Sequence, residues 1–216
     1  MLRVGLTGSL GSGKTTIAAI FREHGIHVLE ADTIARAMMQ PGQPVFRSIV
    51  EHFGPSVVRA DGSLDRPRLA TLAFSDGRLN ELNRIVHPPV IAEQERRMSE
   101  IFARDPRAIV VIESALIFEA EAWGTVPNWR QRFDRVVLVI APDDLKIQRF
   151  LARILPADSE ARVAAERDAR SRLAAQLPDS VKIPNSDFII DNSGPLDATR
   201  LQVERIAAEL HAAAGV

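Results

Sequence analysis

Short apolar runs alternate with helix-like patterns along the chain. Five runs, most of them rich in valine, isoleucine or leucine, predict strands at residues 3–7, 27–30, 108–112, 135–140 and 188–190. Apolar residues at helical spacing predict helices at residues 15–24, 143–177 and 197–213, the second being a helix–turn–helix broken near Pro156. Strands separated by helices favour right-handed crossovers, and therefore a parallel sheet that helices cover on both faces.

The segment between the second and third predicted strands is too long for a plain crossover. It spans residues 33–107 and holds apolar residues at helical spacing, such as Leu82, Ile85 and Val86, between several prolines and glycines. We therefore expect a helical subdomain inserted into a single α/β domain.

Composition narrows the class of protein. The chain has 216 residues, of which 46% are hydrophobic, and this is enough for a full core. It has no cysteine, which excludes disulfides and cysteine metal sites. Its formal charge of -1 comes from interspersed acids and bases, so it has no general attraction for nucleic acid or membranes. The chain shows neither a signal-peptide pattern nor a long apolar stretch, so we expect a cytoplasmic protein.

Residues 8–15 match the phosphate-binding pattern G-x-x-x-x-G-K-[ST], between the first predicted strand and the first predicted helix. Glycines in such a loop let backbone N–H groups turn inward around a phosphate. Lys14 would reach the β- and γ-phosphate oxygens, and the Thr15 hydroxyl could ligate Mg²⁺. The alternative is an ordinary Gly/Ser turn before a helix. The predicted nucleotide contacts are Gly8, Gly11, Ser12, Gly13, Lys14, Thr15 and Thr16.

The chain lacks the sequence signatures of two other classes of nucleotide-binding protein. The base-specifying Asn/Thr-Lys-x-Asp of GTPases is absent, and so is the Leu-Ser-Gly-Gly-Gln of transporter ATPases. The small kinase class remains, in which an arginine-rich lid closes over ATP. Arginines in the place of such a lid are Arg149, Arg153, Arg162, Arg167, Arg170 and Arg172.

Asp32 follows the second predicted strand. We expect that strand to lie beside the first, so that its carboxyl end faces the ligand crevice of the sheet. A carboxylate there can hold the acceptor hydroxyl and take its proton. The alternative is that Asp32 caps a helix that begins near Ile34.

Six ordered stretches carry a family resemblance. Residues 5–16 are similar to G-L-T-G-G-I-G-S-G-K-S, and residues 30–36 look like D-A-D-x-I-A-R. The remaining stretches are His87-Pro88, residues 116–119 (Leu-Ile-Phe-Glu), residues 148–153, and Ala175-Gln176 followed by residues 187–192. In this order they resemble the dephospho-CoA kinase family, which transfers phosphate from ATP to the ribose 3′-hydroxyl of dephospho-CoA in the last step of coenzyme A synthesis.

The chain departs from the family pattern at a few positions. Ser9 replaces the usual second glycine of the loop, and Ala115 stands where a proline is usual. Glu113 stands where many members have aspartate. Residues 120–132, with Trp123 and Trp129, and residues 155–172 look longer than usual.

The resemblance implies a fold and a division of the chain. The fold is the P-loop NTPase fold of nucleoside-monophosphate-kinase type, in three layers with a five-stranded parallel sheet. Residues 1–32, 108–148 and 173–216 would form the core, residues 33–107 an acceptor-binding helical insert, and residues 149–172 the lid.

The resemblance also implies roles for single residues. Asp32 would be the base, with Lys14 as the second catalytic residue. Arg36 would bind acceptor phosphate or ribose, unless it is only a solvated helix residue. His87 would line the acceptor site, unless it precedes a helix that begins at Pro88. The remaining predicted acceptor contacts are Leu116 and Glu119.

On the donor side, Arg149 and Arg153, one helical turn apart, are the better lid candidates for phosphate. Mg²⁺ would arrive with ATP, held by Thr15. Glu113 either faces the Mg²⁺ shell through water or simply ends its strand. ATP and dephospho-CoA are the expected partners, with no nucleic acid or membrane, and a monomer is favoured.

Two alternatives remain open from the sequence. The first is a kinase of the same architecture for another small molecule, such as a nucleoside, gluconate or shikimate. It would differ in the pocket formed by residues 33–107. The second is a P-loop protein that holds nucleotide without transferring phosphate, against which Asp32 and Arg36 argue.

Overall fold

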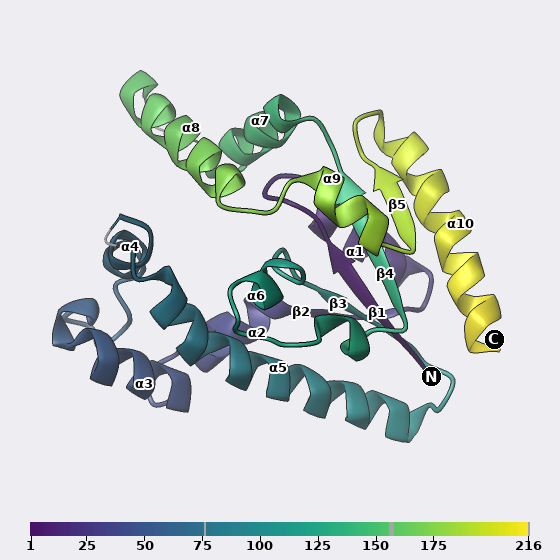
Figure 1. Ribbon diagram of the computed structural model, residues 1–216, viewed down its shortest axis with the longest axis horizontal. Helices are drawn as coiled ribbons and strands as arrows, with labels where there is room; N and C mark the ends of the chain where they lie inside the picture. The colour runs from purple at the N-terminus through teal and green to yellow at the C-terminus, as the bar shows by residue number, and fades with distance from the viewer. Residues whose placement is uncertain (76, 156–157, 216) are drawn as a thin grey trace.

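The computed structural model describes residues 1–75, 77–155 and 158–215 of the chain. Within them, one parallel sheet holds five strands in the order β2-β3-β1-β4-β5. The carboxyl ends of these strands meet at one edge (Figure 1). The prediction of five parallel strands is confirmed, and each bound lies within one residue of the predicted one. The strands are β1 (Leu2–Thr7), β2 (His27–Glu30), β3 (Ile109–Glu113), β4 (Arg135–Ile140) and β5 (Phe188–Asp191).

Helices connect the strands and form the insert and the predicted lid. The first five are α1 (Lys14–Glu23), α2 (Ala31–Met38), α3 (Pro44–Phe53), α4 (Arg66–Ala70) and α5 (Leu79–Arg104). The others are α6 (Glu119–Ala122), α7 (Asp143–Ile154), α8 (Ser159–Ala174), α9 (Asp179–Lys182) and α10 (Leu196–Ala214). Short 3₁₀ or π turns cover Pro55–Val57, Thr71–Ser75, Trp129–Arg132 and Ile183–Asn185. No helix in the described parts of the chain is long and apolar enough to cross a membrane.

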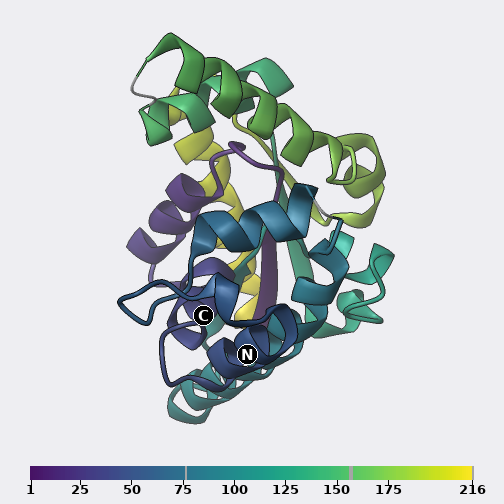
Figure 2. The same cartoon turned by 90° about the vertical axis from the view of Figure 1, so that its left-hand side faces the viewer.

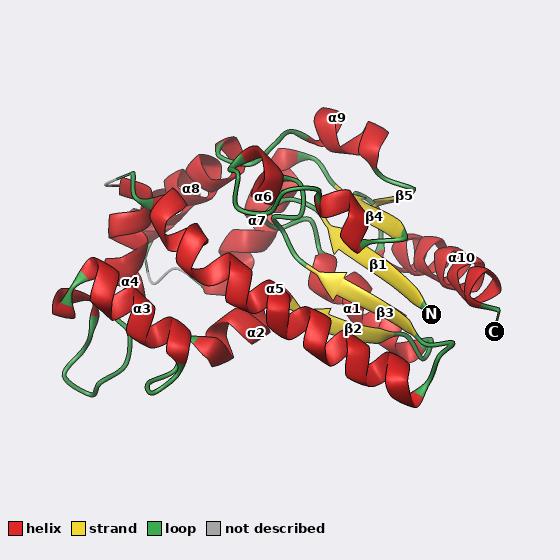
Figure 3. Cartoon of the chain, turned by 60° about the horizontal axis from the view of Figure 1, so that its bottom comes forward, coloured by secondary structure: helices red, strands yellow, loops and turns green. Residues whose placement is uncertain are grey.

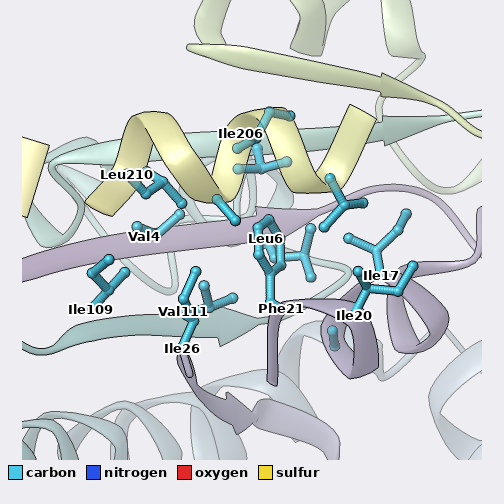
Figure 4. Close-up of a cluster of buried hydrophobic side chains, with 14 of the residues drawn as sticks. Val4, Leu6, Ile17, Ile20, Phe21, Ile26, Ile109, Val111, Ile206 and Leu210 are labelled. Atoms are coloured by element: carbon cyan, nitrogen blue, oxygen red, sulfur yellow. The ribbon is translucent and has the colours of Figure 1, made fainter. Parts of the chain in front are cut away.

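The main core lies between the sheet and two helices, α1 and α10 (Figure 4). Side chains of one strand face, such as Val4 and Val111, pack there against Phe21 and Ile206. The opposite face of the same strands is also buried. Val110, for example, belongs to a second cluster with residues of α5 and of the segment after β3. Burial of both faces explains why the strands read as continuous apolar runs.

The insert packs around α5, which runs along the side of the sheet (Figure 3). Helices α2 to α4 form a separate apolar cluster with the first half of α5. This helix continues through Pro88 and Pro89, which lie inside it. The alternative that His87 precedes a helix beginning at Pro88 is therefore wrong. Proline in a helix interior removes a backbone hydrogen bond, so packing of α5 against its neighbours must hold this part of the helix in place.

Helices α7 and α8 form the predicted helical pair, which lies above the insert in Figure 2. They pack through Ile147, Phe150, Leu151 and Ala169, and Leu10 of the phosphate loop joins this cluster. The pair therefore lies beside the loop that would hold the phosphates of ATP. The predicted break at Pro156 lies outside the described residues.

Candidate active site

The loop between β1 and α1 has the tight geometry that phosphate binding needs. Gly11 has a φ of +71°, and a Cβ there would lie 2.1 Å from the Lys146 carbonyl oxygen. Gly13 has a φ of +98°, and its Cβ would lie 2.1 Å from Nδ2 of Asn192. Only glycine fits either position, because a side chain would both strain the backbone and collide with a fixed neighbour.

Lys14 lies over this loop. Its Nζ donates to the carbonyl oxygens of Gly8 and Ser9, at 2.8 and 3.2 Å. Burial lowers the pKa of Lys14, and the nearby carboxylates of Glu113 and Asp32 oppose that shift. The ammonium group thus lies close to acidic side chains at the place where the loop would hold a phosphate.

A cavity of about 460 Å³ opens from the phosphate loop toward the insert. It is lined by Lys14, Thr15 and Asp32 and by apolar and aromatic side chains such as Val86 and Trp123. The predicted residues Glu113, Leu116 and His87 also line it. The structure therefore brings together residues from β3, α1, α2 and α5 that lie far apart in the sequence.

The position of Asp32 differs from the sequence argument in two ways. Strand β2 does not lie beside β1, because β3 is between them. Helix α2 begins at Ala31 with Glu30 as its N-cap, so Asp32 lies in the first turn and is not the capping residue. Asp32 nevertheless lines the cavity, since the carboxyl ends of all the parallel strands meet at the same edge.

Glu113 is the last residue of β3, the strand that lies between β2 and β1. In the sheet register it pairs with Leu6 of β1 on one side and Glu30 of β2 on the other. Burial raises the pKa of Glu113, as do the charges of Asp32 and Glu30, whereas Lys14 lowers it. Glu113 therefore ends its strand and also faces the cavity, so the two alternatives for this residue are compatible.

His87 projects from α5 and is half-buried. Its Nδ1 lies 2.9 Å from Oγ1 of Thr125, whose hydroxyl donates to the Ala120 carbonyl at 2.9 Å. Because that hydroxyl proton is already used, Nδ1 must carry the proton shared with Thr125. Burial lowers the pKa of His87, which favours the neutral ring. Its Nε2 is then an acceptor on the cavity wall.

A second cavity, of about 380 Å³, is also lined by Lys14. The phosphate loop, α7 and the start of α10 line it, and both Arg149 and Arg153 are among its lining residues. Nη1 of Arg149 is buried and has no hydrogen-bond partner among the described residues. Gly11, Lys14, Thr15 and Arg153 line both cavities. The wall that separates the two cavities is thus cationic.

Two predicted acceptor contacts lie elsewhere. Arg36 is exposed on α2 and does not line either cavity. The Glu119 carboxylate is fully buried, 2.6 Å from Nζ of Lys182, and accepts from the Leu177 N–H at 3.1 Å. Glu119 therefore ties α6 to α9, and its position does not support a contact with substrate.

Several lining residues were not predicted as contacts. Arg132 and Gln94 meet on the cavity wall through a 2.9 Å hydrogen bond, and nothing in their local sequence marks them. Asn192 donates from Nδ2 to the Ser12 carbonyl at 2.8 Å. Its place directly after β5, at the ligand edge of the sheet, is a signal that could have found it.

Comparison with known proteins decides the family. The family model of dephospho-CoA kinase matches residues 2–198. The chain belongs to the dephospho-CoA kinase family. This family phosphorylates the ribose 3′-hydroxyl of dephospho-CoA with ATP, the final step of coenzyme A synthesis, and the chain is accordingly a kinase.

Curated relatives and solved structures agree with this assignment. A dephospho-CoA kinase of Corynebacterium efficiens is 36% identical over 97% of this chain and 98% of its own length. A dephospho-CoA kinase of Symbiobacterium thermophilum is 42% identical over 93% of this chain and 78% of its own length. The crystal structure of TT1252 from Thermus thermophilus is 30% identical, with a TM-score of 0.72 over 97% of each chain. Dephospho-CoA kinase from Campylobacter jejuni, 21% identical over 98% of each chain with a TM-score of 0.67, shares the fold.

Proposed function

We propose that phosphoryl transfer takes place at the wall shared by the two cavities. ATP would occupy the cavity beside α7, and the dephospho-CoA ribose would occupy the cavity beside the insert. The observation that carries this proposal is that Lys14, Thr15 and Arg153 line both cavities. A phosphoryl group passing from one substrate to the other would stay in contact with the same two cations, Lys14 and Arg153, throughout.

Lys14 and the lid arginines neutralise charge in this proposal. The transferring group carries its charge on three oxygens in a loose transition state, so positioned cations supply most of the catalysis. Lys14 is held over the loop by its hydrogen bonds to the carbonyl oxygens of Gly8 and Ser9. Arg149 and Arg153 lie on the donor side, where the buried Nη1 of Arg149 is available to a phosphate or a ring nitrogen.

Asp32 holds and deprotonates the acceptor hydroxyl. It lies on the acceptor side and not on the donor side of the wall. A carboxylate at that place orients the 3′-hydroxyl toward the phosphate and accepts its proton late in the transfer. Leu116 and the neutral ring of His87 line the same cavity and would contact the bound dephospho-CoA.

Mg²⁺ fits the donor set of this site. The Thr15 hydroxyl and the carboxylates of Asp32 and Glu113 line one cavity, and hard oxygen ligands of this kind suit Mg²⁺. We propose that the ion enters with ATP, with Thr15 as a direct ligand and Glu113 acting through water. When bound, Mg²⁺ would neutralise charge on the phosphates.

The helical insert, residues 33–107, is proposed to select the acceptor, and the α7–α8 pair to act as the lid over ATP. The two small molecules are the expected partners, and a monomer in the cytoplasm, where ATP is available, stays the expected form.

A phosphotransfer screen tests the proposed function. Purified protein with ATP and Mg²⁺ is assayed against dephospho-CoA, adenosine, uridine, pantetheine, gluconate and shikimate. The kcat/KM for dephospho-CoA should exceed that for adenosine by at least about a hundredfold, because remote contacts with the rest of the acceptor help to place the ribose. A better turnover of any other acceptor would show that the insert selects a different substrate.

A further inference from the structure

The segment that follows the lid, residues 175–182, crosses back over the phosphate loop. Gln176 in this segment bonds to two parts of the site at once. Its Oε1 accepts from the Leu10 N–H at 3.0 Å, and its Nε2 donates to the Ala115 carbonyl at 3.3 Å. One side-chain amide therefore joins the loop on the ATP side to the loop after β3, which lines the acceptor cavity.

Both contacts are close to the reacting groups. Leu10 belongs to the loop that carries Lys14, and Ala115 lies two residues after Glu113. Gln176 also lies only two residues after Ala174, the end of α8, so it connects the base of the predicted lid to both loops. A change in the orientation of α8 would therefore move this amide and, with it, the two loops.

Neighbouring contacts hold the segment firmly. Oδ1 of Asp179 accepts from the Ser9 hydroxyl at 3.2 Å, and its Oδ2 lies 2.9 Å from Nζ of Lys146 on α7. The buried pair of Lys182 and Glu119 anchors the far end of the segment to α6. The Ser9 contact is particular to a chain with serine here, because the usual glycine has no hydroxyl. The amide of Gln176 is thus presented from a fixed base.

We infer that Gln176 is a positioning residue for the transfer: it holds the phosphate loop and the loop after β3 at the separation that aligns ATP with the acceptor hydroxyl. Displacement of a reacting group by about 1 Å can cost about a hundredfold in rate. Loss of the amide should therefore lower the rate of transfer more than it weakens the binding of either substrate. This inference rests on the proposed function.

The test compares Gln176→Met and Gln176→Glu with the wild type. Methionine keeps the length of the side chain and loses both hydrogen bonds. Glutamate can still accept from the Leu10 N–H, but its carboxylate cannot donate to the Ala115 carbonyl. We expect both variants to lose about 10- to 100-fold in kcat, while the Kd of an ATP analogue and that of dephospho-CoA each stay within about threefold of wild type.

Gln202→Met is the matched control. The Gln202 amide also bonds only to backbone: it accepts from the Asp191 N–H at 3.0 Å and donates to the carbonyls of Asp191 and Ala198, at 2.9 and 3.2 Å. These bonds are at β5, which β4 and β1 separate from β3. The kcat of this variant should stay near the wild-type value. Melting temperatures of all three variants show whether the fold is intact.

Three results would overturn the inference. A wild-type kcat in either Gln176 variant shows that the bridge is not needed. A large loss of dephospho-CoA affinity assigns Gln176 to direct substrate contact, and equal losses in Kd, kcat and melting temperature assign it to general stability. If instead the wild-type enzyme fails to phosphorylate dephospho-CoA, the proposed function fails before the variants are compared.

Discussion

A substitution at Asp32 distinguishes a catalytic role for this residue from a structural one. Asp32→Asn keeps the shape of the side chain and removes its basicity. The residue is exposed in the first turn of α2 and is not its N-cap, so the substitution should leave the melting temperature nearly unchanged. The kcat should fall by roughly 10²–10⁴-fold, the usual contribution of a positioned base, with the Kd of ATP little affected.

Measuring kcat, nucleotide Kd and melting temperature together on Asp32→Asn decides between these roles. A normal kcat would reject Asp32 as the base. A low kcat with an unchanged melting temperature supports it, because no loss of folded protein then explains the loss of rate.

We predict that the ionised Glu113 carboxylate lowers the free energy of unfolding, although the reaction needs it. Burial raises its pKa, so the folded state binds the proton more tightly than the unfolded state does. The destabilisation is therefore complete above the raised pKa and disappears as the pH falls toward the ordinary carboxyl value. Glu113→Gln should raise the melting temperature at pH 8 and change it little near pH 4. Its kcat should fall at every pH, and a variant that is no more stable at pH 8 contradicts the prediction.

At the scale of elements, the buried pair between α6 and α9 should matter for stability. Glu119→Ala leaves the Lys182 ammonium buried without its carboxylate, which typically costs about 3–5 kcal/mol. Denaturant unfolding measures this loss. The double variant Glu119→Met with Lys182→Met should recover much of it, because no unpaired charge remains. A stable single variant with a raised KM for dephospho-CoA would instead return Glu119 to the acceptor site.

Helices α7 and α8 are predicted to close over ATP. The pair contacts the phosphate loop through a small apolar cluster, and small contacts of this kind permit movement. Limited trypsin cleavage between Arg153 and Arg172 should slow several-fold when a non-hydrolysable ATP analogue and Mg²⁺ are added, since closure shields these arginines. Cleavage in α5, at Arg96 or Arg97, is the internal control. Equal rates with and without the analogue would show only a solvated helical pair.

At the scale of the whole molecule, local patterns predicted the strands well and their order less well. Continuous apolar runs specify a strand buried on both faces, and this is why the central strands β1, β3 and β4 could be predicted. The edge strands β2 and β5 are only partly buried, and their runs are shorter. The neighbour of β1 was assigned wrongly, because nothing in the run from His27 to Glu30 states which strand it pairs with. That choice depends on the long insert, which returns the chain between β2 and β1 as β3.

The candidate site shows the same division. Lys14 and Thr15 could be predicted, because a phosphate loop is contiguous in sequence. Asp32 and His87 were found from motifs, and the structure brings both to one cavity. Glu119 matched a motif equally well, yet it is held inside the protein by Lys182, a residue 63 positions away whose position the sequence could not supply.

The shared wall between the two cavities has a consequence for ligand design. Since Lys14, Thr15 and Arg153 face both cavities, one molecule could occupy both by joining adenosine polyphosphate to the 3′-oxygen of dephospho-CoA. Tethering makes the second binding event intramolecular, so such a compound could bind about 10²–10⁴-fold more tightly than either half. Kinases that share only the ATP cavity would bind half of it, and its selectivity would come from the cavity that the insert provides.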